Sequence, residues 1–180
     1  MSEHPIHHLI YGHLHDYLTG ERLLDTDDER IRQRITKMMV EDKCYKKDTL
    51  EPRCYIDTLF NLHFVRSTIE LTVTIANKRF MIIRYDPGSL VSRQRSAVAA
   101  ARVLDDRYRI PLAVVTNGQD AELIDTNDGK IIGSGLAAIP NRQQAEELVV
   151  DLLFLPPQHQ EKRQRELRIL NAFDLERCCL

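Results

Sequence analysis

Cysteines are scarce in this 180-residue sequence, and no C-x-x-C spacing occurs among them. Cys44, Cys54, Cys178 and Cys179 are too few and too irregularly spaced for a disulfide framework in a chain of this length. The two early and two C-terminal cysteines could instead clamp a metal ion or an iron–sulfur cluster, but adjacent cysteines chelate one ion poorly. We therefore expect free thiols, some of them buried.

Long apolar runs are also missing. The stretch 149–155 is interrupted by Asp151 and is far shorter than the roughly 18 residues of a membrane span. The N-terminus has no basic segment followed by an apolar one, so we expect no secretory signal. No G-x-x-x-x-G-K-[ST] motif occurs, which excludes ATP-driven translocation by these residues. We expect a cytoplasmic protein without a membrane partner.

Neither sign of charge dominates the sequence. It contains 25 Lys and Arg against 27 Asp and Glu, for a formal net charge of −2. No global field therefore attracts the molecule to nucleic acid, and such binding requires a local basic patch. The hydrophobic fraction of 43% and charged fraction of 29% are typical of a single globular domain with a sizeable core.

Histidines are concentrated at the N-terminus, where residues 1–26 hold five of the seven. His4 and His8 have the spacing of zinc ligands on a helix. No carboxylate or cysteine completes a ligand set with them, and the alternative is a polar, loosely helical N-terminal arm. We expect this arm to end in a turn at Thr19-Gly20.

Hydrophobic periodicity predicts an alternation of helices and strands. Thr26 or Asp27 can cap a helix over about 27–42, and clean alternation over 69–75 and 79–85 predicts a hairpin. The other expected elements are strands at 54–57, 112–116, 121–125 and 130–132, and helices at about 90–108, 141–153 and 160–177. This order predicts an α/β fold with a mixed β-sheet flanked by helices and with extra C-terminal helices.

The C-terminal segment alternates charge at helical spacing and carries a few apolar anchors. Those anchors are Leu167, Ile169, Leu170 and Phe173. The helix can fold back on the core, or it can pack against a second copy or a partner protein, and the pattern does not choose between these. We expect three segments: an N-terminal arm (1–26), a core (27–140) and a C-terminal helical extension (141–180).

The best candidate for a nucleic-acid contact is the stretch 78–109, which holds eight basic and three acidic side chains. Two of the arginines, seven residues apart, share one face of the expected helix, and a third projects elsewhere. Serines at the helix N-terminus, with its free N–H groups, could hold a phosphate oxygen. The predicted contact residues are Ser89, Ser92, Arg93, Arg95 and Arg102. The alternative is an ordinary solvated helix face.

The order of elements also resembles a known family. The stretches DTDDERIRQRITKMMVED, IELTVTIANKRFMIIRYDPGSLVSR, SAVAAARVL and IPLAVVTNGQDAELIDTNDGKIIGSGL are similar to the N-terminal nuclease domain of type I restriction enzyme R subunits. The similarity covers residues 25 to about 140, roughly two thirds of the chain. The resemblance implies a restriction-endonuclease-like core of the PD-(D/E)xK nuclease superfamily.

In such nucleases a carboxylate begins the first strand of the hairpin, and an acidic-x-Lys triplet lies on the second strand. The two carboxylates hold Mg²⁺, and the lysine positions or deprotonates a water bound to the metal. The resemblance places Glu70 at the first carboxylate and Glu29 at an assisting helix acid. The triplet falls on Arg84-Tyr85-Asp86, with Arg84 in place of the acid and Asp86 in place of the lysine.

An arginine neither ligates Mg²⁺ nor accepts a proton at neutral pH, so the resemblance implies a degenerate catalytic site. Sliding the triplet by one residue gives Ile83 and Tyr85, which are no better. We expect Arg84 to form an internal ion pair with Glu70, filling the metal position.

Three functions stay open: a degenerate domain that binds DNA or other nucleic acid without a cofactor, an active Mg²⁺-dependent DNA endonuclease, and a protein-interaction or homodimer module. In the endonuclease, Glu70 and Asp86 would ligate the metal, Glu29 would assist, and Arg93 would supply the basic group.

Overall fold

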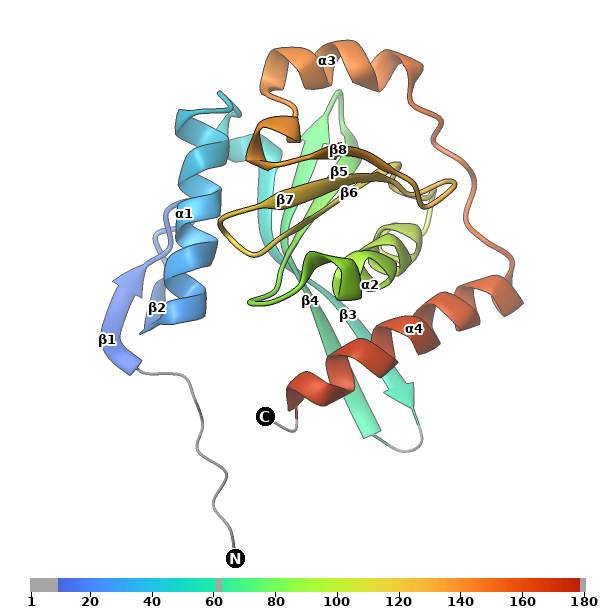
Figure 1. Cartoon of the computed structure of the whole chain (residues 1–180), viewed down its shortest axis with the longest axis horizontal. Helices are drawn as coiled ribbons and strands as arrows, with labels where there is room; N and C mark the ends of the chain where they lie inside the picture. Colours follow the sequence, from blue (N-terminus) through green and yellow to red (C-terminus); the bar gives the residue numbers. More distant parts are fainter. Residues whose placement is uncertain (1–9, 61–62, 179–180) are drawn as a thin grey trace, which may run out of the picture.

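The computed structural model describes residues 10–60 and 63–178. A six-stranded sheet with the order β3-β4-β5-β6-β7-β8 forms its centre (Figure 1). β5 and β6 are parallel, and every other neighbouring pair is antiparallel. The strands are β3 (Leu50–Phe60), β4 (His63–Ile75), β5 (Lys78–Tyr85), β6 (Leu112–Thr116), β7 (Ala121–Asp125) and β8 (Ile131–Ser134).

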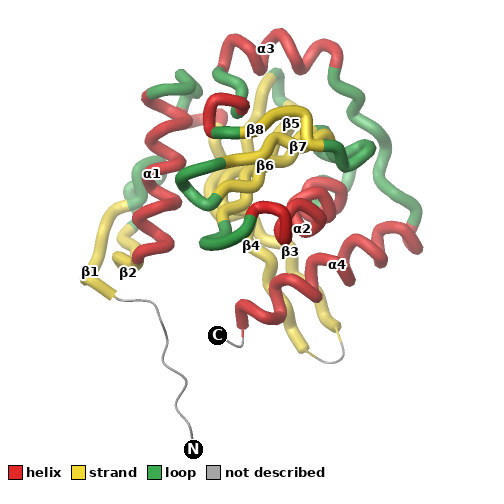
Figure 2. The backbone as a smooth tube through the Cα atoms, in the orientation of Figure 1, coloured by secondary structure: helices red, strands yellow, loops and turns green. Residues whose placement is uncertain are grey.

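Helices cover both faces of this sheet (Figure 2). Apolar residues of α1 and α3 join one core cluster with Leu71 and Ile83, and those of α2 and α4 join a second cluster with Ile82 and Val115. The helices are α1 (Asp27–Glu41), α2 (Leu90–Val103), α3 (Arg142–Asp151) and α4 (Gln160–Cys178), with short 3₁₀ turns η1 (Lys47–Thr49) and η2 (Leu136–Ala138). The expected α/β class, with a mixed sheet, flanking helices and C-terminal helices, is confirmed. No helix in the described part of the chain is long and apolar enough to cross a membrane.

The prediction of a loosely helical N-terminal arm is wrong for its described residues. β1 (Ile10–His15) and β2 (Arg22–Thr26) instead form an antiparallel two-stranded sheet beside α1. The expected turn lies between them and includes Thr19-Gly20, where Gly20 has a φ of 73°. The proposed zinc ligands His4 and His8 lie outside the described residues.

Local sequence signals explain where α1 and α3 begin. Thr26 caps α1, because its Oγ1 accepts a hydrogen bond from the Glu29 N–H at 3.1 Å. Asn141 and Gln144 form a reciprocal capping box at the start of α3. The helix predicted to reach residue 108 ends at Val103, because the Asp105 carboxylate accepts from the Arg107 N–H and holds a tight turn there.

The predicted strand 54–57 is part of a much longer strand. β3 pairs with β4 from Leu50↔Val73 to Phe60↔His63. Only residues 71–75 of β4 also pair with β5, so the rest of β3 and β4 extends from the sheet as a long two-stranded ribbon (Figure 1). Pro52 is tolerated because β3 is an edge strand.

The C-terminal helix folds back on the core. α4 lies along α2 and one face of the β3–β4 ribbon, and Leu170 is fully buried among residues of α2. Of the two arrangements that the sequence left open for this helix, the intramolecular one is present.

Candidate functional site

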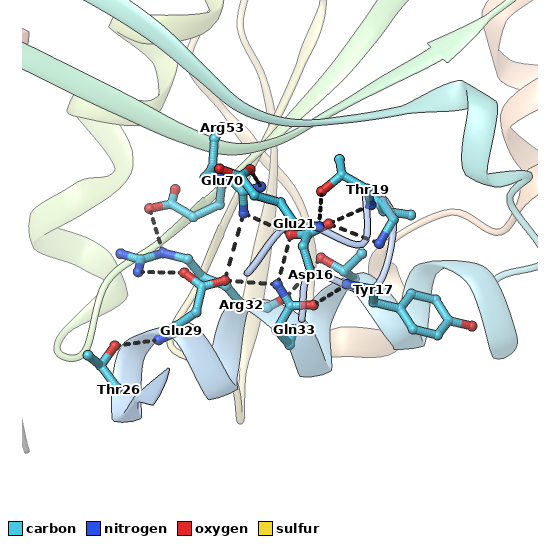
Figure 3. A network of polar contacts seen from close by, with 12 residues as sticks. Asp16, Tyr17, Thr19, Glu21, Thr26, Glu29, Arg32, Gln33, Arg53 and Glu70 are labelled. Atoms are coloured by element: carbon cyan, nitrogen blue, oxygen red, sulfur yellow. Dashed lines mark hydrogen bonds and ion pairs between the residues drawn. The ribbon is translucent and has the colours of Figure 1, made fainter. Parts of the chain in front are cut away.

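Three buried carboxylates gather on the α1 face of the sheet. Asp16 lies in the β1–β2 turn, Glu29 in the first turn of α1 and Glu70 on β4, and these residues are 4%, 9% and 6% exposed. Figure 3 shows them with the guanidinium groups of Arg32 and Arg53 between them. These five residues are called the α1-face cluster below.

The cap of α1 determines where two polar side chains of the helix point. The helix begins at Asp27, so Glu29 and Gln33 lie one turn apart on the same helix face, directed at the sheet. The Gln33 amide donates to Glu29 Oε1 at 2.8 Å and to Asp16 Oδ2 at 2.9 Å. Its carbonyl oxygen accepts from the Tyr17 N–H at 2.8 Å. Gln33 therefore ties the β1–β2 turn to α1.

Arg53 reaches the cluster from an irregularity in β3. Its φ of 53° is in the left-handed region, which residues other than glycine rarely adopt. Before this point Leu50 packs in the core beside α1, whereas Ile56, six residues on, packs in the core beside α2. An even spacing in a regular strand keeps the same face, so the strand exchanges its faces near Arg53.

The guanidinium of Arg53 contacts three carboxylates. Its Nη1 donates to Asp16 Oδ2 at 2.8 Å and lies 3.9 Å from Glu29 Oε1. Its Nη2 donates to Glu21 Oε2 at 3.2 Å. Charge-assisted contacts of this kind are among the stronger ones in proteins when they are shielded from water.

Arg32 bridges the two carboxylates that the resemblance assigns to catalysis. Its Nη1 lies 3.5 Å from Glu29 Oε2, and its Nε lies 3.6 Å from Glu70 Oε1. The other oxygen of Glu70, Oε2, accepts from the Tyr85 N–H at 3.0 Å. The structure thus brings Glu29 and Glu70 together, with the guanidinium of Arg32 between them.

The ionisation of Asp16 reflects these contacts. Burial raises the pKa of its carboxyl, but hydrogen bonds from Thr19 N–H, Gln33 and Arg53 outweigh burial and lower the pKa to about 2. Asp16 is therefore an anion throughout the physiological pH range.

Arg84 lies on the opposite face of the sheet from Glu70. Its Nη1 donates to Ser96 Oγ of α2, and its Nη2 is 3.0 Å and 3.3 Å from the two carboxylate oxygens of Asp174 in α4. The predicted ion pair between Arg84 and Glu70 is wrong, because alternation along β5 directs Arg84 to α2 and α4. The neighbours of Arg84 on β5, Ile83 and Tyr85, instead belong to the α1-face core with Leu71.

Asp86, the second predicted metal ligand, follows β5 and is 3.0 Å from the guanidinium Nε of Arg93. The Tyr85 hydroxyl donates to Asp28 Oδ1 at 3.1 Å. The pKa of that hydroxyl is raised by burial and by the adjacent Asp28 carboxylate. Tyr85 therefore stays protonated and acts as a hydrogen-bond donor.

The residues present do not fit a Mg²⁺ ion between Glu29 and Glu70. Mg²⁺ needs an octahedron of oxygen ligands at about 2.1 Å, and a guanidinium supplies only donors. Arg32 lies within 3.6 Å of both carboxylates, where such an ion would sit. Among the side chains that the structure describes, no three of His, Cys, Asp or Glu are arranged to hold a metal ion.

The predicted nucleic-acid residues do not form one group. Arg93 pairs with Asp86 and donates to the Phe173 carbonyl, and Arg102 pairs with Glu166 at 2.8 Å. Arg95 is exposed. Ser89 is the N-cap residue of α2 but makes no side-chain cap, and the Ser92 hydroxyl donates to the Ser89 carbonyl.

The cysteines that the structure describes in full are free thiols. Cys44 is exposed, and Cys54 is a partly buried residue of β3, where burial raises the pKa of its thiol. The side chain of Cys178 and all of Cys179 lie outside the described residues, so the expectation of free thiols stays a prediction for these two cysteines.

A comparison with protein-family models places these residues in a known family. The model of the type I restriction enzyme R protein N terminus matches residues 27–140, which is more than half of the chain. The chain belongs to this family. No curated protein and no solved structure matched it.

The match contains Glu29, Glu70, Arg84 and Asp86, all of which the sequence resemblance had singled out. Sequence reasoning missed Asp16, Arg32, Gln33 and Arg53, which complete the polar contacts of the α1 face. A signal existed for Gln33, which follows Glu29 by one helical turn. None existed for Arg53, because only the left-handed backbone at that residue directs it to the cluster.

Proposed function

We propose that this restriction-enzyme-related domain binds nucleic acid and has lost metal-dependent cleavage. The observation that carries the proposal is the position of Arg32, whose guanidinium lies between Glu29 and Glu70. In a cleaving relative, a divalent ion between such carboxylates would lower the pKa of a bound water and produce the nucleophile. A guanidinium neutralises the carboxylates but cannot carry that water.

Two further features support the loss of cleavage. The β5 residues of the α1-face core are Phe80, Met81, Ile83 and Tyr85, none of which provides a carboxylate or an amine. Arg84 and Asp86 each have an ion-pair partner, Asp174 for the first and Arg93 for the second. The alternative of an active nuclease would require Arg32 and Arg93 both to move and a base to be recruited.

Nucleic-acid binding rests on family membership and on basic side chains of α2 and α4. A domain that keeps this fold without the chemistry can still contact the phosphate backbone, because such contacts need only placed cations. The third possibility, a protein-interaction or homodimer module, predicts no such contact.

The test combines a binding and a cleavage measurement. Labelled duplex and single-stranded DNA are titrated with the protein by fluorescence anisotropy at ~50 mM and ~200 mM salt, and plasmid is incubated with Mg²⁺ or Mn²⁺. We expect salt-dependent binding at micromolar protein and an intact plasmid, with Glu70→Ala indistinguishable from the parent. If the parent cleaves the plasmid and Glu70→Ala does not, the protein is an active nuclease. If no salt-dependent binding is observed, the protein-interaction or homodimer module is the remaining function.

A further inference from the structure

A basic groove lies between α2 and α4, on the face of the sheet opposite the α1-face cluster. It has a volume of about 530 Å³ and is also lined by residues of the β7–β8 turn and of the segment that follows α3. Its basic lining residues are Arg95, Arg102, Arg109, Lys162 and Arg165, and its acidic ones are Asp128 and Glu166. Cations are therefore in excess, although the chain as a whole is slightly negative.

The floor of this groove holds two arginines in fixed positions. Arg102 donates to Glu166 Oε1 at 2.8 Å and to the Thr126 carbonyl at 2.7 Å, and Arg109 donates to the Pro156 carbonyl at 3.1 Å. Burial lowers the pKa of Arg109, and the nearby charge of Arg102 lowers it further. One buried carboxylate, Glu166, therefore lies near two guanidinium groups.

The other acidic residue does not cancel this excess. The Asp128 carboxylate is 2.7 Å from the ammonium of Lys130, which neutralises it locally. At the rim, Arg95 extends from α2, and Lys162 and Arg165 extend from the first turns of α4, all three exposed to solvent. The groove thus combines two hydrogen-bonded arginines with three exposed cations at its rim, an arrangement that attracts a polyanion.

We propose that this groove binds the phosphate backbone of nucleic acid, with α4 supplying two of its five basic side chains. The inference rests on the proposed function and adds its location. The ligand would lie on the α2–α4 face, with the sheet between it and Glu29 and Glu70. Recognition through rim cations is sequence-independent, because phosphates carry no base identity.

The experiment compares two charge-reversed variants of equal charge. Lys162→Glu/Arg165→Glu alters the rim, and Arg34→Glu/Lys37→Glu alters exposed cations of α1 on the other face. Each variant is titrated into labelled DNA over a series of salt concentrations, with a thermal melt to verify folding. We expect the rim variant to bind roughly tenfold or more weakly and to reduce the salt slope by about 2, while the α1 variant keeps the parental slope.

Two other outcomes overturn the inference. If the parent binds DNA and the rim variant binds equally well, the groove is not the contact surface, although the proposed function stands. If polyglutamate displaces DNA from the parent as well as an oligonucleotide of equal charge does, the groove holds anions without preference for phosphate. A parent that does not bind DNA contradicts the proposed function itself.

Discussion

Replacing Asp174 with alanine is expected to lower the free energy of unfolding by about 3–5 kcal/mol. Asp174 and Arg84 are 3% and 5% exposed, and their side chains meet in a two-oxygen contact of 3.0 Å and 3.3 Å. Removing the carboxylate leaves the guanidinium of Arg84 buried, with a hydrogen bond to Ser96 Oγ but without its counter-charge. A guanidinium is not deprotonated in proteins, so the buried charge cannot be relieved by loss of a proton.

Urea unfolding at neutral pH measures the effect, and the exposed Asp57–Arg66 pair provides a matched control. That pair has two equivalent contacts of 2.7 Å and 2.8 Å, but its side chains are 42% and 51% exposed. Asp57→Ala should therefore cost no more than about 1 kcal/mol. The double variant Arg84→Met/Asp174→Leu should recover most of the stability. A loss below about 1 kcal/mol in Asp174→Ala would show that the pair is not buried in solution.

Replacing Arg53 with alanine is expected to destabilise the protein by a similar amount, about 3–5 kcal/mol at pH 7. The substitution leaves Asp16 and Glu29 buried with one cation fewer. An alanine at this position keeps the strained left-handed backbone of Arg53 but not its ion pairs. The β1–β2 turn would also lose one of its links to β3 through Asp16.

The effect of Arg53→Ala should depend on pH. In the parent, the pKa of Asp16 is lowered from 3.8 to about 2, so the stability that it contributes is full above pH ~4 and is lost as the pH falls through ~2. In the variant the pKa of Asp16 rises, because a hydrogen bond to its charged form is lost. The difference in unfolding free energy between the two proteins should therefore shrink between pH ~4 and ~2. If the difference in unfolding free energy is constant across that range, Arg53 does not stabilise the charged form of Asp16.

The fold was predictable where the sequence alternates or carries a cap. Alternation over 69–75 and 79–85 specified the β4–β5 hairpin, and Thr26 and Asn141 specified the starts of α1 and α3. The β1–β2 hairpin was missed because its strands are short and mostly exposed, so hydrophobic alternation gives little signal there.

The candidate site was predictable only in part, for two physical reasons. Glu29 and Glu70 could be assigned by resemblance, since each lies in a stretch similar to the family. The partner of Arg84 could not be assigned, because Asp174 is 90 residues away on a helix whose docking depends on tertiary packing. Arg53 depends on one unusual backbone conformation, for which its neighbours in the sequence give no turn signal.

Together these contacts give the two faces of the sheet different roles. On the α1 face, Arg32 and Arg53 neutralise carboxylates that would otherwise attract a divalent ion. On the other face, the ion pairs Arg84–Asp174 and Arg102–Glu166 fix α4 beside α2 and so form the basic groove. We propose that binding was retained on one face after the chemistry was lost on the other.

The central claim, that a guanidinium replaces the metal ion at Glu29 and Glu70, is tested most directly by titrating the protein with Mn²⁺ and following the electron paramagnetic resonance signal of the free ion. The account predicts that the signal of the free ion stays undiminished at equal concentrations of ion and protein, in the parent and in Glu70→Gln alike. One Mn²⁺ bound per chain in the parent and none in Glu70→Gln would contradict it.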